Sequence, residues 1–234
     1  MAQIGTHARR TRRPDAGGYA RGIETRQRIV LAALELFGRD GYERTSTRDI
    51  AALAEVNAPV LQYYFDGKEG LYSACAEYMS SRIREIMQPV IETVRGRLNK
   101  RISRDGLVDC VCLVFECAVE FMLLNPELEC WTGFITWNES DKAPLKARKV
   151  IEEGIGNEIR ALVREVIGRI IGKHSDDTET RIRALTLGGQ LAVFSVARQH
   201  SLEYIGWKSV DKKALRRLAA IVRQQTTAAL SSVA

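Results

Sequence analysis

Lys68 stands where a positive charge is unfavourable unless an anion binds beside it. Asp66 and Glu69 form a D-x-x-E pattern typical of the first turn of a helix, which places Lys68 inside that turn. The start of a helix carries a partial positive charge, so an ammonium group there is destabilising. A phosphate would remove this penalty, because the backbone N–H groups and the ammonium would bind it together. The pattern therefore predicts a phosphate contact at Lys68.

The residues before Lys68 predict a short helix with an outward face of polar and small side chains. Leu61 and Phe65 are spaced i and i+4, so they bury one side of a helix expected over residues 58–65. Asn57 suits the cap of this helix, and Pro59 is tolerated because its first turn needs no intrahelical N–H donor. The side chains that this leaves on the outside or at its edge are Ala58, Pro59, Gln62, Tyr63 and Tyr64.

Three helix-start signals between Thr45 and Leu71 position these side chains. They are an S-x-x-D pattern beginning at Ser46, the cap at Asn57, and the D-x-x-E pattern beginning at Asp66. Two short helices joined by three residues and followed by a longer helix have the spacing of a helix-turn-helix motif. This motif lays its second helix in a groove of DNA, so the stretch predicts a DNA-binding function.

The basic residues are concentrated near the N-terminus. The 234-residue chain has a net charge of +6, which suits an acidic partner. Residues 1–28 contain seven arginines against Asp15 and Glu24, an excess of +5, so the rest of the chain shares only +1. Residues 1–22 lack an apolar period and are expected to form a flexible basic arm. This arm is either a solubilising tail or an extension into the minor groove, where arginine is favoured.

Composition predicts a soluble intracellular chain of one large or two modest domains, with 45% apolar and 27% charged residues. Four of the five cysteines, Cys110, Cys112, Cys117 and Cys130, lie in one apolar region. They suit reduced thiols packed as small hydrophobic groups, with sensing of oxidants or metals as the alternative. The three histidines are scattered, so no metal site is expected. We expect no secretory signal and no membrane span, because acidic residues interrupt the longest apolar run.

Helical periodicity elsewhere predicts an all-α fold. Pro89 should kink or end the helix that starts near Lys68, before a short basic link. Adjacent Gly188 and Gly189 cost about 1 kcal/mol each in a helix, which suggests the close approach of another backbone. Another break is expected over residues 140–144. The helices expected outside the motif cover about residues 24–39, 67–88, 104–124, 128–137, 145–172, 178–200 and 211–230.

Acidic residues share one strip of the helix expected over 104–124. They are Asp109, Glu116 and Glu120. Three interpretations remain open: a solvated edge, a partner for basic residues, or a site for a cationic ligand.

Residues 24–72 resemble the N-terminal domain of the TetR (tetracycline repressor) family of bacterial transcription regulators. The resemblance lies in TRQRIVLAALELFGRDGYERTSTRDIAALAEV and QYYFDGKEGLY. The strings VNAPVLQYYFDGKEGLY and RIRALTLGGQLAVFSVARQHSLEYIGW are similar, more narrowly, to the CecR-like branch. The resemblance implies a helix-turn-helix domain over residues 23–67 and a helical domain over 68–234 that binds an effector and forms a homodimer.

The resemblance also implies which residues contact DNA. Two copies would place their recognition helices in successive major grooves of a palindromic operator, about 34–36 Å apart. Gln62 is the strongest candidate for base recognition, because an amide can bond adenine at two positions. Thr45, Ser46 and Arg48 would lie beside the DNA backbone, Asn57, Ala58, Pro59, Val60 and Gln62 would face base edges, and Tyr63, Tyr64 and Lys68 would meet phosphate or sugar.

The larger domain should supply the dimer contacts and an effector pocket. Dimerisation is expected through the 145–172 and 178–200 helices, as a four-helix bundle across a two-fold axis. The expected interface residues are Ile159, Leu162, Val166, Leu185, Gly188, Gly189 and Phe194. The side chains that line the effector pocket, unless they are plain core, are Phe115, Phe121, Met122, Trp131, Phe134 and Trp137.

Several positions depart from the family pattern. Glu55 stands where glycine is usual, in a turn that often needs positive φ, so the turn should be strained by about 1–2 kcal/mol or distorted. Asn57 replaces Ser or Thr and should cap equally well. Ala58–Pro59 replaces a Lys-Gly pair, which removes a cation and should shift operator choice. Gly67 replaces Ser, so Asp66 should take over the cap.

We expect a dimeric transcription regulator of the bacterial cytoplasm, most often a repressor in this family, that a small-molecule effector releases from or retunes on its operator. The alternatives are an architectural DNA-binding protein and a regulator without a small-molecule ligand. No nucleophile with its base and no paired carboxylates stand out by spacing, so no catalytic residue, metal or cofactor is expected.

Overall fold

The computed structural model describes residues 16–138 and 143–232, and every regular element within them is an α-helix. The predicted all-α fold is confirmed. The first helices are α1 (Ala16–Arg44), α2 (Thr47–Leu53), α3 (Ala58–Tyr64) and α4 (Gly67–Leu98). The others are α5 (Arg104–Leu124), α6 (Leu128–Asn138), α7 (Leu145–Glu152), α8 (Ile155–Ile171), α9 (Thr178–Val196), α10 (Arg198–Ile205) and α11 (Lys212–Ser231). None of these helices is both long and apolar enough to cross a membrane.

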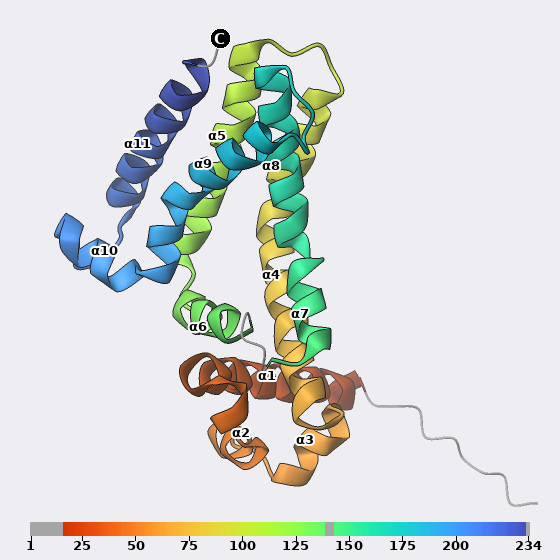
Figure 1. Cartoon of the computed structure of the whole chain (residues 1–234). Helices are drawn as coiled ribbons and strands as arrows, with labels where there is room; N and C mark the ends of the chain where they lie inside the picture. The colour runs from red at the N-terminus through yellow and green to blue at the C-terminus, as the bar shows by residue number, and fades with distance from the viewer. Residues whose placement is uncertain (1–15, 139–142, 233–234) are drawn as a thin grey trace, which may run out of the picture.

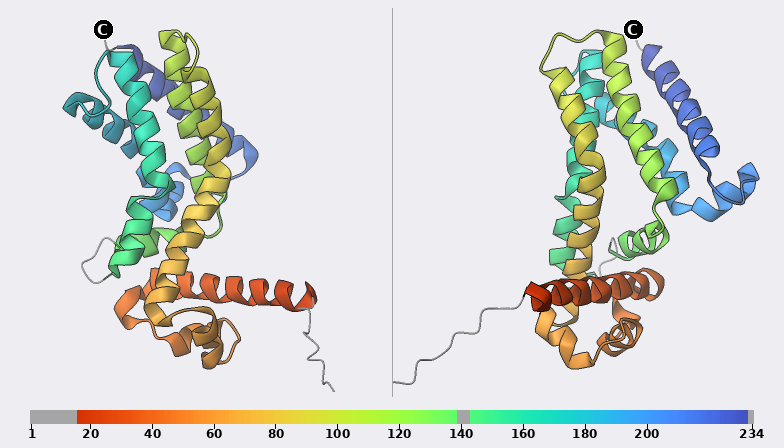
Figure 2. Two further views of the ribbon diagram at one scale, coloured as in Figure 1. Left: turned by 90° about the vertical axis from the view of Figure 1, so that its right-hand side faces the viewer. Right: turned by 180° about the vertical axis from the view of Figure 1, so that it is seen from behind.

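The helix-turn-helix motif lies at one end of an elongated molecule. α1 crosses this end, with α2 and α3 on one side of it and α6 on the other (Figure 1). α4 starts beside α3 and runs into the rest of the chain, where α7 and α8 lie along it (Figure 2). α11 packs along α5 at the outer edge. α4 is therefore a continuous link between the motif and the larger part of the chain.

Two hydrophobic clusters share α4. The first surrounds α1 and includes Phe37, Tyr72 of α4 and Phe134 of α6. The second is formed mainly by α5, α8, α9 and α11 with the distal part of α4. The predicted division of the chain at residues 67 and 68 stays a prediction, because α4 contributes to both clusters.

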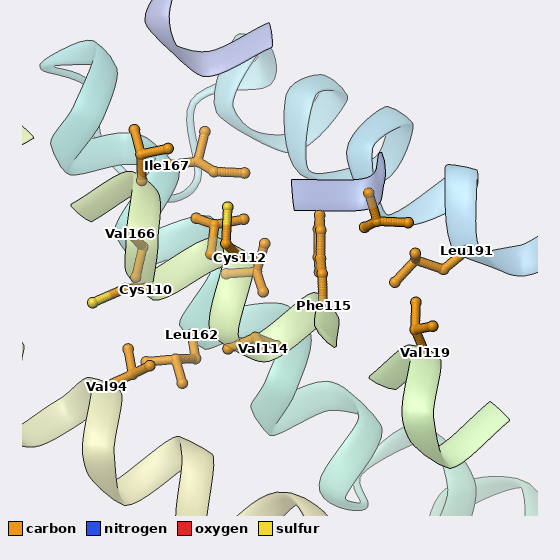
Figure 3. Close-up of a cluster of buried hydrophobic side chains, with 14 of the residues drawn as sticks. Val94, Cys110, Cys112, Val114, Phe115, Val119, Leu162, Val166, Ile167 and Leu191 are labelled. Carbon is orange, nitrogen blue, oxygen red and sulfur yellow. The ribbon is translucent and has the colours of Figure 1, made fainter. Parts of the chain in front are cut away.

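Cysteines of α5 are part of the second cluster. Cys110 and Cys112 lie among Val166, Ile167 and other apolar side chains (Figure 3). Burial raises the pKa of both thiols, which keeps them protonated and poorly reactive. All five cysteines are free. These contacts match the expected packing of reduced thiols and give no support to a sensing role.

Two predicted helix ends are wrong. α1 begins at Ala16, so residues 16–22 of the expected flexible arm are helical, while residues 1–15 lie outside the described part. α4 continues through Pro89 to Leu98. Pro89 and Glu85, whose carbonyl loses its helical donor, are both exposed, so water can satisfy that carbonyl.

Two long helices predicted near the C-terminus are each divided in two. The 145–172 segment breaks before α8, where Gly154 is extended (φ −74°, ψ −167°). The 178–200 segment breaks at Ala197 (φ −122°, ψ 39°), where the Ser201 hydroxyl donates to the Val193 carbonyl at 3.1 Å. The same carbonyl also accepts the helical hydrogen bond of the Ala197 N–H at 3.2 Å, so the hydroxyl adds a second bond that ties α10 to the end of α9. Of the break expected over residues 140–144, residues 140–142 lie outside the described part.

The acidic strip of α5 binds arginines rather than forming a solvated edge. Arg223 of α11 donates to Asp109 at 2.6 Å and to Glu116 at 2.8 Å. Arg97 of α4 also pairs with Asp109. Hydrogen bonds from Arg223 and then Arg97 lower the pKa of Asp109, so its carboxylate stays ionised. Glu120 is exposed. This network joins three helices, and the pairing interpretation is the correct one for two of the three acids.

α6 crosses α1 at a contact between two backbones. A Cβ atom on Gly133 would lie 2.3 Å from the Gly38 carbonyl oxygen, and one on Gly38 would lie 2.4 Å from the Cys130 carbonyl oxygen. Beside this crossing, Phe134 stacks on Tyr72 with ring centroids 4.3 Å apart. No side chain other than hydrogen fits at either glycine. The crossing thus fixes α6 directly on the DNA-binding end.

Substitution of Gly133 by alanine tests this crossing. The added methyl forces the two backbones apart, so we expect Gly133→Ala to destabilise the fold by about 1–3 kcal/mol. Gly96→Ala is a matched control, because nothing lies within 4 Å of a Cβ atom at that exposed helical site. The control should gain about 0.5–1 kcal/mol. Thermal unfolding of both variants measures this, and equal stability of the two would contradict the close crossing.

Candidate nucleic-acid interface

The first helix of the motif begins as its sequence predicts. The Ser46 hydroxyl oxygen accepts the Asp49 N–H at 3.1 Å and its hydrogen is donated to the Asp49 carboxylate at 2.6 Å. Ile50, Ala51 and Ala54 then pack into the core. The S-x-x-D cap of α2 is confirmed, and it orients α2 with Arg48 exposed.

The turn between α2 and α3 keeps the geometry that glycine would adopt. Glu55 has φ 53° and is the one non-glycine residue with positive φ among those described. The turn is closed by the Val56 N–H, which donates to the Ala51 carbonyl at 2.9 Å. Of the two expectations for Glu55, strain is confirmed and distortion is wrong. The cost is about 1–2 kcal/mol for a residue with a Cβ atom in the left-handed region.

Asn57 stands at the cap of α3 but its side chain does not cap. It has the extended backbone of a cap residue (φ −76°, ψ 142°) and makes no side-chain cap hydrogen bond. Pro59 has no N–H to offer, and the Val60 N–H already donates to the Asn57 backbone carbonyl at 2.9 Å. The expected capping role is therefore wrong. As a result, the exposed Asn57 amide is available to a partner.

The start of α4 also differs from the expectation. Asp66 makes no cap hydrogen bond, so its predicted role as the replacement cap is wrong. Gly67 instead adopts φ 68°, a value that favours glycine over the usual serine. The chain therefore enters α4 through backbone geometry rather than through a side-chain cap.

Lys68 has partners within the chain. Its ammonium donates to the Glu43 carbonyl at 3.3 Å and lies 4.3 Å from the centre of the Tyr42 ring. Burial lowers the pKa of Lys68, and the charge of Glu43 partly opposes that change. The carbonyl and the ring compensate the charge that is unfavourable at the start of α4. A phosphate contact at Lys68 is thus not needed for this position and stays a prediction.

The ends of α1, α2, α3 and α4 enclose a groove of about 760 Å³. It contains residues predicted to contact DNA together with others that the sequence did not single out. The predicted residues in the groove are Thr45, Ser46, Arg48, Ala58, Pro59, Gln62 and Lys68, and the additional ones include Glu43, Arg44, Thr47 and Gly67. Arg44 follows the positive-φ Gly41 and precedes the α2 cap, a position that could have indicated a phosphate-binding side chain.

The outward face of α3 carries an aromatic ring in water. Tyr63 is 84% exposed, and its neighbour Gln62 is exposed as well. Ala58 and Pro59 are exposed, while Val60 and Tyr64 are half-buried against the motif. An aromatic side chain beside an amide on a projecting helix is typical of a surface that contacts a partner.

The expectation for Thr45 needs correction. Its side chain is 3% exposed, and its hydroxyl lies 2.8 Å from the Gly41 carbonyl and 3.1 Å from the Leu36 carbonyl. Both contacts are with the end of α1, so the hydroxyl is not available to a DNA backbone. Thr45 instead ties α1 to the start of α2.

The six aromatic and apolar residues predicted to line an effector pocket lie outside both the groove of the motif and the cavity between α4, α6, α7 and α8. Phe115, Trp131 and Phe134 are at most 4% exposed and belong to the two cores. Phe121, Met122 and Trp137 are half-buried, and Trp137 packs over Gly41. Three of these rings fill the cores, and the pocket-lining role of the six residues stays a prediction. A cavity lies elsewhere, between α4, α6, α7 and α8.

The residues predicted at the dimer interface divide into two groups. Leu162, Val166 and Phe194 are buried within the single chain, and Ile159 is half-buried. Leu185 is 76% exposed, and nothing lies within 4 Å of a Cβ atom at Gly188 or Gly189. The exposed group lies on α9, so α9 offers the surface that a second chain could cover.

Comparisons with known proteins agree with this geometry. Residues 29–75 match the family described as bacterial regulatory proteins, tetR family, and residues 115–233 match the C-terminal domain of the HTH-type transcriptional dual regulator CecR. The chain is 26% identical over 194 residues to that regulator from Shigella flexneri, covering 82% of this chain and 85% of the relative. It is 30% identical over 112 residues to the HTH-type transcriptional activator FasR of Mycolicibacterium smegmatis, covering 45% and 51%.

A solved structure shows the same fold. The crystal structure of a TetR-family transcriptional regulator from Bordetella parapertussis superimposes with a TM-score of 0.60 at 19% identity, covering 86% of this chain and 93% of that one. The helical architecture is therefore shared over almost the whole length of both chains.

A glycine at position 55 should stabilise the protein. Glu55→Gly removes the left-handed strain, and we expect a gain of about 1 kcal/mol, or roughly 2–4 °C in the midpoint of thermal unfolding. Glu55→Ala is the control, because it removes the same charge but keeps a Cβ atom at positive φ. Calorimetry of the three proteins would show the gain for glycine alone. A rise for alanine as well would mean that the carboxylate, not φ, destabilises the turn.

Proposed function

Since this chain belongs to the TetR family of bacterial regulatory proteins, with a C-terminal domain of the CecR type, we propose that it acts as a homodimer that represses transcription from a palindromic operator and responds to a small-molecule effector. It is a DNA-binding transcriptional regulator. The observation that supports our assignment of the DNA contact is the outward face of α3, where Gln62 and Tyr63 project beside the groove. We place the protein in the bacterial cytoplasm, where its operator is.

The side chains of this face suit different parts of DNA. The exposed amides of Asn57 and Gln62 can each bond adenine at two positions in the major groove. Ala58 and Pro59 offer apolar contact to thymine methyl groups. Ser46 and Arg48, at the start of α2, would bind the phosphate backbone and set the register. The phenol of Tyr63 would add a further phosphate or sugar contact.

Dimerisation on α9 is supported by an apolar stripe that residues 16–138 and 143–232 leave exposed. Ile182, Leu185, Val193 and Val196 are 46–76% exposed and lie with Gly189 on one side of the helix. Their spacing of three and four residues is that of a helix–helix seam. Because glycine has no side chain, Gly188 and Gly189 would let a helix of the second chain approach α9 closely. Two adjacent glycines inside a helix led us to expect such an approach. This stripe would hold two motifs at the separation that a palindrome requires.

Control by an effector would pass through α4 and α6. α4 joins the motif to the larger part of the chain, and α6 touches α1 at the Gly38–Gly133 crossing. A ligand that binds one arrangement of these helices more tightly than another would shift the protein between DNA-binding and released forms. The relatives are named as a dual regulator and an activator. An in vitro transcription assay therefore tests whether this protein represses transcription, as proposed, or activates it.

Two substitutions separate base recognition from phosphate contact. Gln62→Ala should change which base is preferred at one operator position, with a loss of about 1–3 kcal/mol in discrimination. Arg48→Gln should weaken binding to all sequences. The slope of log K against log salt, which is negative, should become less steep by about 0.9. Binding titrations on an operator library at several salt concentrations measure both. An unchanged base preference for Gln62→Ala would remove Gln62 from recognition.

Footprinting on the DNA upstream of the protein's own gene tests the regulator against an architectural role. Protection of a discrete palindrome supports a sequence-specific dimer. Uniform coverage along the fragment would support an architectural DNA-binding protein instead.

A charge on the α9 stripe should separate the two chains. Leu185→Glu places a carboxylate at a side chain that is 76% exposed in the monomer, so its own fold should remain intact. We expect a monomer by sedimentation and at least a tenfold loss of operator affinity, since burying an unpaired charge costs several kcal/mol. Leu145→Glu, at a leucine 70% exposed on α7, is the matched control and should stay dimeric. A dimeric Leu185→Glu protein would exclude this stripe as the interface.

A further inference from the structure

A cavity of about 550 Å³ lies between α4, α6, α7 and α8, within the size range of small-molecule sites. One part of its wall is apolar and another is polar. The apolar lining residues are Ala76, Met79, Ile83, Ile135, Ile151 and Ile155, and the other lining residues are Ser80, Asn138, Arg148, Gly156 and Arg160. A ligand that fills it must therefore have an apolar body and a polar end.

The polar part of the wall is positively charged. Arg148 and Arg160 both line the cavity, and no carboxylate stands among the described lining residues. Arg160 makes no hydrogen bond or ion pair with any residue of 16–138 or 143–232. The acid in the first turn of α8, Glu158, is held by Arg84 at 3.0 Å and Arg95 at 2.9 Å, so its charge is already compensated from α4.

The first turn of α8 opens into the same place. Ile155 and Gly156 begin this 17-residue helix and line the cavity. Gly154, at the cap, offers no side chain, and the Asn157 N–H donates to the Gly154 carbonyl at 3.0 Å, so the N–H groups of Ile155 and Gly156 are the ones that no described side chain caps. A helix start with free N–H groups and partial positive charge attracts anions. Together with the two guanidinium groups, it selects for a negative group at this end of the cavity.

Asn138 supplies an independent sign that something binds here. Its residue is 3% exposed, yet its side-chain oxygen has no hydrogen-bond partner among the described residues. A buried amide oxygen without a donor is destabilising, because it has lost its hydrogen bonds to water. Buried polar atoms in native proteins nearly always have a hydrogen-bond partner, so we expect a bound molecule to donate a hydrogen bond to this oxygen.

We propose that this cavity is the effector site and that its ligand is an amphipathic organic anion with an N–H or O–H donor; this inference rests on the proposed function. The anion lies against Arg160 and the start of α8, with Arg148 in the same part of the wall. The donor binds the Asn138 side-chain oxygen, and the apolar body lies along Met79, Ile83 and Ile151.

The location connects the ligand to DNA binding. Ile135 and Asn138 reach the cavity from α6, while Gly133 and Phe134 of the same helix contact α1 and α4. A ligand that binds Asn138 therefore acts on a helix that is fixed to the DNA-binding end by a backbone contact. Its binding should change the affinity of the dimer for the operator.

N-decanoylglycine and its methyl ester test the chemistry of the site in the intact protein. The acid carries an apolar chain, an amide N–H and a carboxylate, and the ester lacks only the charge. By calorimetric titration we expect the acid to bind at least tenfold more tightly, since charge-assisted hydrogen bonds contribute about 1.5–3 kcal/mol. Arg160→Gln should remove most of the preference for the acid over the ester. Asn138→Leu should lower the affinity for both ligands. Arg216→Gln, at an exposed arginine of α11 outside the cavity, should change neither.

Equal binding of acid and ester, or no binding of either, would overturn the inference. If Asn138→Leu fails to fold, Arg160→Gln still decides it, because Arg160 is exposed and contributes nothing to the core. Operator affinity is measured on the same preparations by fluorescence anisotropy. Failure of the wild-type protein to bind any operator would count against the proposed function. Operator binding without a preference for the anion would count against the effector site alone.

Discussion

The contact between α1 and α6 is the constraint on which the other parts depend. Gly38 and Gly133 bring two backbones closer than any Cβ atom allows, and the stack of Phe134 on Tyr72 closes the space beside them. Because α4 carries Tyr72, three helices meet at this point. The motif cannot tilt relative to the rest of the chain unless α6 or α4 moves with it. A change in the separation of the two recognition helices of a dimer would therefore have to involve a movement of α4 or α6.

Within the motif, interactions inside the chain decide which side chains remain for DNA. The Thr45 hydroxyl and the Lys68 ammonium both bind carbonyls near the end of α1, so they hold the motif together. Asn57 is released in the opposite way, because Pro59 removes the donor that its side chain would cap. Glu55 has a positive φ that is strained for a residue with a Cβ atom, and glycine at this position would relieve the strain. The chain is therefore less stable than it would be with glycine, but it carries a side chain at this site.

α6 takes part in two contacts that lie next to each other. Gly133 and Phe134 are packed against α1 and α4, and Ile135 and Asn138 of the following turn reach a cavity whose charge is set by arginines and by the start of α8. The large aromatic side chains near it fill the cores, so the empty space forms among methionine and isoleucine side chains. A molecule in the cavity would therefore touch α6 within one helical turn of its contacts with α1 and α4.

Local patterns in the sequence predicted the features that depend on neighbours within one or two helical turns. They include the all-α fold, the cap at Ser46 and the exposed Gln62 and Tyr63, since spacing alone decides them. The positive φ at Glu55 was expected from the family resemblance instead. The helix breaks at Gly154 and Ala197, the roles of Thr45 and Lys68, and the position of the cavity depended on residues distant in the chain. Only the tertiary structure decided these, because a hydroxyl, an ammonium or an empty space is defined by what packs around it.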